Sequence, residues 1–60
     1  MRYKIKFSKN QKLPEGFSVE WWDADEMYHW VNGEENSIPY CCRWMAFRSA
    51  WVEFRLKNNV

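Results

Sequence analysis

The 60-residue sequence predicts one small α+β domain, residues 1–60, in which two or three antiparallel strands carry one long C-terminal amphipathic helix on one face. Two stretches in which apolar and polar residues alternate predict the strands. A later stretch in which aromatic residues recur every three or four positions predicts the helix. A chain this short has room for one modest hydrophobic core and for no second domain.

The first strand is predicted at Arg2–Phe7, because apolar and basic residues alternate there with the period of a half-buried strand. The residues expected to face inward are Tyr3, Ile5 and Phe7. The residues expected to face outward are Arg2, Lys4 and Lys6. A loop follows that is longer than most hairpin loops, and it ends in a turn predicted by Pro14 and Gly16.

The second strand is predicted at Phe17–Trp22, which alternates in the same way. Phe17, Val19 and Trp21 share one face, so that Trp22 points to the opposite face. The outward tryptophan needs some cover, and it is therefore a candidate for contact with a partner.

The segment Asp23–Gly33 fits two structures. Asp23–Glu26 has the pattern of a capping box and Asn32–Gly33 that of a helix C-cap, which together would enclose a short helix. Met27–Val31 is instead aromatic and β-branched, which favours a strand, with Ala24–Asp25 at the tip of the preceding turn. We favour the strand, because a two-stranded sheet alone is only marginally stable.

The helix is predicted from Ser37 or Pro39 to about Lys57. Its aromatic stripe consists of Tyr40, Trp44, Phe47, Trp51 and Phe54. A second apolar stripe consists of Cys41, Met45, Val52 and Leu56. Arg48 and Arg55 lie between the two stripes. A small sheet can cover only one of them, and we expect it to cover the aromatic one. The expected core is Tyr3, Ile5, Phe7, Phe17, Val19, Trp21, Trp44, Phe47 and Trp51.

Charge is balanced in sum, at +1, but uneven along the chain. The first twelve residues carry five bases and no acid, residues 13–42 carry seven acids and no base, and residues 43–60 carry four bases and one acid. This pattern is typical either of a solvated surface with internal pairing or of a bipolar surface that orients a partner.

The sequence argues against catalysis and against bound cofactors. The isolated Gly16 and Gly33 form no phosphate-binding loop, and adjacent Cys41 and Cys42 with the single His29 fall short of a zinc site. We therefore expect no enzyme, no cofactor and no metal. We also expect a cytoplasmic protein with no membrane partner, because no apolar run is long enough for a membrane span, the opening residues alternate too strictly for a signal peptide and the cysteines form no disulfide framework.

The leading hypothesis is a non-enzymatic protein-binding module, a small modulator or inhibitor of a larger protein. In size and style, though in no motif, the chain is similar to short single-domain proteins of compact microbial or phage genomes. The predicted partner-binding residues are Trp22, Met45, Arg48, Val52, Arg55 and Leu56. Three arrangements would cover the second stripe: a larger protein, a homodimer with antiparallel helices, or the chain's own loops.

The alternative hypothesis is binding of single-stranded nucleic acid through a basic and aromatic sheet face. Its predicted residues are Lys4, Lys6, Trp22, Tyr28 and Trp30. The acidic middle of the chain would repel phosphates, which makes this the weaker hypothesis.

Overall fold

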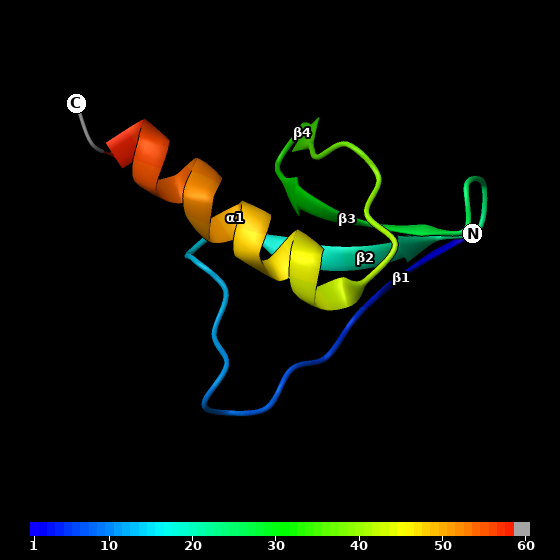
Figure 1. Ribbon diagram of the computed structural model, residues 1–60, viewed down its shortest axis with the longest axis horizontal. Coiled ribbons are helices and arrows are strands. Elements are labelled where there is room, and N and C mark those ends of the chain that lie inside the picture. Colours follow the sequence, from blue (N-terminus) through cyan, green and yellow to red (C-terminus); the bar gives the residue numbers. More distant parts are fainter. Residues whose placement is uncertain (59–60) are drawn as a thin grey trace.

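The computed structural model describes residues 1–58. They form a four-stranded antiparallel sheet with one helix, α1 (Arg43–Asn58), packed across one face (Figure 1). The predicted α+β class is confirmed. The sheet has four strands rather than two or three, because a two-residue strand after Gly33 is too short to show any alternation in the sequence.

The strands lie in the sheet in the order of the sequence. They are β1 (Arg2–Lys4), β2 (Ser18–Trp22), β3 (Met27–Asn32) and β4 (Glu35–Asn36). β1 ends at Lys4 rather than at Phe7 as predicted. The chain leaves the sheet there because Phe7 packs against Trp44 and Phe47 of the helix, with ring centres 5.1 and 4.9 Å apart.

The ambiguous segment Asp23–Gly33 contains a strand, as favoured, and β3 pairs with β2 along its length. The acidic residues that resemble a helix cap instead stabilise a turn. The Asp25 carboxylate accepts a hydrogen bond from the Met27 N–H at 3.1 Å, and Glu26 adopts a left-handed φ of 53°. Gly33, with a φ of 63°, occupies the first central position of the β3–β4 hairpin, where glycine is preferred.

A one-residue bulge interrupts the pairing on the far side of β3. Val31 pairs with Asn36, whereas Tyr28 pairs with Tyr40, so the second segment has gained one residue relative to the first. The extra residue lies at Ser37–Pro39, between the two pairings.

The helix begins later than predicted. Tyr40 exchanges two backbone hydrogen bonds with Tyr28, at 2.8 and 2.9 Å, and is thereby held in an extended conformation. A helix from Ser37 or Pro39 would break both bonds, so α1 begins at Arg43. The predicted end near Lys57 agrees with the observed end at Asn58 within the usual uncertainty of helix termini.

The core lies between α1 and the face of the sheet formed by β2 and β3. Its buried members are Val19, Trp30, Ala46 and Ala50. The helix thus turns two alanines to the sheet, and their small side chains allow a close approach. The predicted aromatic stripe lies about 100° around the helix from them, given the helical repeat.

Two residues of the predicted core are exposed. Trp44 is 43% exposed and Tyr3 is 55% exposed, so both predictions are wrong. Tyr3 is exposed because it lies on the edge strand β1, whereas α1 packs on β2 and β3. Trp44 lies in the first turn of α1, on the aromatic stripe, which faces the loop between β1 and β2 rather than the sheet. Trp51 donates its indole hydrogen bond to the Lys12 carbonyl of that loop at 2.9 Å. Val19 is buried as predicted, and the remaining members are half-buried: Ile5, Phe7, Phe17, Trp21, Phe47 and Trp51.

Candidate functional site

The outward face of α1 carries an apolar strip that no other part of residues 1–58 covers. We call it the outer strip, and it consists of Met45, Val52 and Leu56, whose exposed fractions are 48%, 54% and 67%. Spacings of seven and four residues place the three side chains on one helix face. That face lies about a third of a turn from the buried alanines and from the aromatic stripe, which leaves it to solvent.

A basic flank runs along one side of the outer strip. It consists of Arg48 and Arg55, both exposed, which together with Val52 border shallow hollows beside the strip. Neither guanidinium pairs with a carboxylate in the part of the chain that the structure describes. Both charges are therefore available to a partner.

An acidic flank runs along the other side of the strip. It consists of Glu53 on the helix and of Glu34 and Glu35 at the β3–β4 hairpin, and all three border an open groove between helix and hairpin. The Lys57 ammonium donates a hydrogen bond to the Glu35 carboxylate, and its Nζ lies 3.9 Å from Glu53 Oε2. The hydrogen bond to Glu35 raises the pKa of Lys57 above its ordinary value of 10.5, and the two carboxylate charges act in the same direction.

A hydrogen-bond cluster fixes the helix beneath this surface. Ser49 accepts hydrogen bonds from the Tyr40 hydroxyl at 2.8 Å and from the Trp30 indole at 2.9 Å. Because Trp30 belongs to β3 and Tyr40 to the chain before the helix, these bonds anchor α1 at its middle. The outer strip is thus presented on a rigid element, which favours binding without prior ordering.

Trp22, the sixth predicted partner-binding residue, lies on the opposite face of the sheet from α1. The structure therefore brings Met45, Arg48, Val52, Arg55 and Leu56 together and separates Trp22 from them. The guanidinium carbon of Arg2 lies 3.8 Å from the centre of the Trp22 ring, and the His29 ring centre also lies 3.8 Å from it. Arg2 comes from β1 and His29 from β3, so both strands that neighbour β2 supply a group that packs on the indole.

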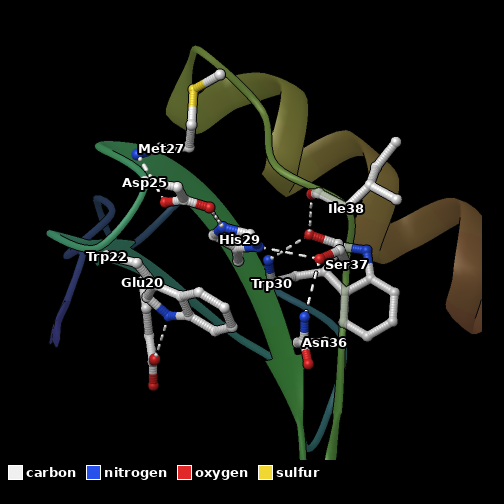
Figure 2. Close-up of polar contacts among 9 residues, drawn as sticks. All are labelled: Glu20, Trp22, Asp25, Met27, His29, Trp30, Asn36, Ser37 and Ile38. Atoms are coloured by element: carbon white, nitrogen blue, oxygen red, sulfur yellow. Dashed lines mark hydrogen bonds and ion pairs between the residues drawn. The ribbon is translucent and has the colours of Figure 1, made fainter.

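His29 organises the polar contacts on that side of the sheet (Figure 2). Its Nδ1 lies 2.9 Å from the Ser37 carbonyl oxygen, and its Nε2 lies 2.7 Å from the Asp25 carboxylate. Both oxygens are acceptors, so a ring nitrogen that carries a hydrogen donates it to the oxygen that it faces. The ring is 3% exposed, and its two contacts join the β2–β3 turn to the bulge. We therefore assign His29 a structural role.

The residues of the nucleic-acid hypothesis are divided between the two faces of the sheet. Lys4 and Trp22 lie on the face away from the helix, whereas Tyr28 and Trp30 lie on the helix side. Lys6 is exposed beyond the end of β1. Stacking of a base on Trp22 would first require displacement of Arg2 or His29 from its ring.

No family model matches the sequence, and no curated protein or solved structure matches it either. Within residues 1–58, no helix is long and apolar enough to cross a membrane. The same residues contain no cluster of three His, Cys, Asp or Glu side chains placed to hold a metal ion.

The acidic flank is not among the site residues predicted from the sequence. Glu53 has a visible signal, because it precedes Lys57 by four residues on a predicted helix, a spacing typical of surface pairs. Glu34 and Glu35 have none, because their place beside the helix depends on the β3–β4 hairpin and on the bulge after it.

Proposed function

We propose that the protein is a non-enzymatic protein-binding module that binds its partner through the outer strip and the basic flank. In this proposal it acts in the cytoplasm as a small modulator or inhibitor of a larger protein. The observation that carries the proposal is the exposure of Met45, Val52 and Leu56 in one continuous row beside two arginines that pair with no carboxylate within residues 1–58. The two free thiols of Cys41 and Cys42 suit a reducing compartment.

The energetics favour a partner for this surface. Burying a half-exposed aliphatic side chain contributes on the order of 1 kcal/mol to the free energy of binding, so three such residues give a modest driving force for association. Arginine and methionine are enriched at the centres of protein interfaces, where an arginine contributes both a charge and an apolar stem. A small surface of this kind supports reversible binding rather than a permanent complex.

The chemistry of the surface also defines what the partner must present. Complementarity requires an apolar strip opposite Met45, Val52 and Leu56. It further requires carboxylates along one side of that strip, opposite Arg48 and Arg55. A surface helix with acidic residues along one flank meets both conditions.

The test is a pull-down from a lysate of the source cells with tagged protein. Met45→Asp/Val52→Asp places two charges in the outer strip, and Asn10→Asp/Gln11→Asp places the same two charges in the exposed loop as a control. We expect the wild type and the control to retain a common protein that the strip variant loses. Circular dichroism should show the same fold for all three chains, because both sites are exposed.

Two results would contradict the proposal. The first is retention of the same proteins by the strip variant, which would place binding elsewhere on the surface. The second is a wild type that retains no protein and does not self-associate. Quenching of tryptophan fluorescence by single-stranded DNA or RNA at low salt, lost on changing Lys4 and Lys6 to Gln, would favour the nucleic-acid hypothesis instead.

A further inference from the structure

We propose that the partner of the outer strip is a second copy of this chain, bound around a twofold axis with the two α1 helices parallel. This inference rests on the proposed protein-binding function, and it names the occupant of the same surface. The chain itself carries what that surface requires, namely an apolar strip on a helix with carboxylates along one side.

The spacing along the helix is that of a helix-pairing seam. Residues Cys42, Met45, Ser49, Val52 and Leu56 follow one another at intervals of three, four, three and four. This is the repeat of the a and d positions at which two helices interlock. Of these five residues, Met45, Val52 and Leu56 are exposed and would make the contact, whereas Cys42 and Ser49 are half-buried. The three exposed side chains lie about a third of a turn from the buried alanines, on a helix face that no other part of residues 1–58 covers.

The two sides of the seam carry opposite charge. Arg48 and Arg55 occupy one side, and Glu53 occupies the other. Glu34 and Glu35 at the neighbouring hairpin extend the acidic side, and the single ammonium of Lys57 offsets one of these three carboxylates. Each copy is therefore basic on one side of the strip and acidic on the other.

Symmetry then decides the relative direction of the helices. In a parallel pair, the twofold axis runs along the helices and sets the basic flank of each copy against the acidic flank of the other. Arg48 precedes Glu53 by five residues, which is the separation that joins flanking positions across parallel helices. The pair would thus contain two symmetry-related contacts between Arg48 and Glu53.

The antiparallel homodimer considered in the sequence analysis has the opposite charge pattern. Its twofold axis is perpendicular to the helices and sets the basic flank of one copy against the basic flank of the other. Arg48 would then face Arg55, and the acidic flanks would also face each other. Like charges across an interface disfavour this arrangement, so the parallel one is favoured.

The dimer is expected to be weak. A helix of 16 residues is about 24 Å long, and three half-exposed side chains bury less area than a standard interface. We expect dissociation constants in the micromolar to millimolar range. Sedimentation equilibrium at protein concentrations up to about 1 mM covers this range.

Charge reversal tests both the occupant and the direction. In the parallel dimer, Arg48→Glu faces Glu53 and Glu53→Arg faces Arg48, so each variant alone should dimerise about 3- to 10-fold more weakly, from two altered pairs. An equimolar mixture of the two variants should restore dimerisation, because both contacts are then between opposite charges. In the antiparallel dimer, Arg48→Glu would face Arg55 and strengthen association. That result would overturn the proposed direction.

The native cysteines give a second measure of direction. Cys41 is exposed and Cys42 half-buried, and both lie directly before the first turn of α1. A parallel dimer brings these thiols of the two copies to the same end, whereas an antiparallel dimer separates them by most of the helix length, too far for a disulfide. Mild oxidation should therefore give covalent dimers faster for the wild type than for Met45→Asp/Val52→Asp, which keeps both thiols and reports the rate of random collision.

The outcomes separate this inference from the function on which it rests. Suppose that the wild type stays monomeric at about 1 mM and that the strip variant loses a different protein in the pull-down. This result would overturn the second copy as the occupant, but the protein-binding function would still hold. Dimerisation that the strip variant retains would overturn the outer strip as the dimer interface, and only retention of the same proteins in the pull-down would also overturn the binding function. Equal oxidation rates for the wild type and the strip variant would overturn the parallel arrangement.

Discussion

The two faces of the sheet are stabilised by different means. The face under α1 is closed by apolar packing, in which Val19 and Trp30 meet two helix alanines. No helix or strand of residues 1–58 lies over the other face, and the side chains of the sheet itself cover it. There Trp22 stacks against Arg2 and His29, and His29 is hydrogen-bonded at both nitrogens. A chain with one helix can therefore bury a polar ring on the uncovered face, provided that other groups of the chain supply the ring's hydrogen-bond partners.

The largest effect is expected on the covered face. Trp30→Ala removes a buried ring and its hydrogen bond to Ser49, so we expect it to lower the free energy of unfolding by about 3–5 kcal/mol. Trp44→Ala, at a position that is 43% exposed, should cost about 1 kcal/mol. Urea denaturation of both variants measures the difference. Equal losses would mean that the aromatic stripe, rather than the alanine contact, supports the fold.

The close approach of the helix gives the second prediction. Ala50→Leu inserts three carbon atoms where Ala50 is fully buried against the sheet, and we expect a loss of about 1–3 kcal/mol from overpacking. Val52→Leu, two residues away on the outer strip, should change stability by no more than about 0.5 kcal/mol. Thermal melts of the two variants provide the measurement. A neutral Ala50→Leu would show that the helix and sheet are less tightly packed than described.

The uncovered face is tested through His29. His29→Phe keeps a ring for Trp22 to stack on but removes the hydrogen bonds to Asp25 and to the Ser37 carbonyl. We expect it to lower the free energy of unfolding by about 1–2 kcal/mol, because water can reach part of what is left unpaired. Asp25→Asn, which keeps a side chain able to accept a hydrogen bond, should cost less. A neutral His29→Phe would show that stacking alone holds this face.

The smallest effect is expected at the edge of the sheet, where Lys57 bonds to Glu35. Because this pairing raises the pKa of Lys57, it stabilises the folded chain below pH 10.5, and the stabilisation is lost as the pH rises through the raised pKa. Glu35→Gln should lower the pKa of Lys57 towards its ordinary value, whereas Glu34→Gln should have little effect. An NMR titration of the lysine side chain measures both. An unchanged pKa in Glu35→Gln would contradict the assigned cause.

Much of the fold could be predicted from local patterns. Alternation identified β1 and β2, composition favoured β3 over a helix, and aromatic spacing identified α1. The predictions that were wrong concern features that depend on contacts between distant segments. The helix begins at Arg43 because Tyr40 pairs with Tyr28, and the aromatic stripe that includes Trp44 faces the β1–β2 loop rather than the sheet. No local pattern encodes either contact.

The candidate site, like the fold, could be predicted from the sequence only in part. Met45, Arg48, Val52, Arg55 and Leu56 share a helix face by spacing alone, and the structure keeps them together. Trp22 was grouped with them because it points away from Trp21, but pointing outward does not place a residue beside the helix. The acidic flank required the path of the chain through the β3–β4 hairpin, which spacing along one helix cannot give.

The order of the strands bears on how the chain folds. Each strand pairs with its neighbour in sequence, and only residues 5–17 separate a pair by more than a tight turn. Short loops cost little closure entropy, so the hairpins β2–β3 and β3–β4 can form early and β1 can join afterwards. Folding should therefore be fast for a sheet protein, and β1 should be the last strand to form and the first to detach. Unfolding of the domain is therefore expected to begin with the detachment of β1.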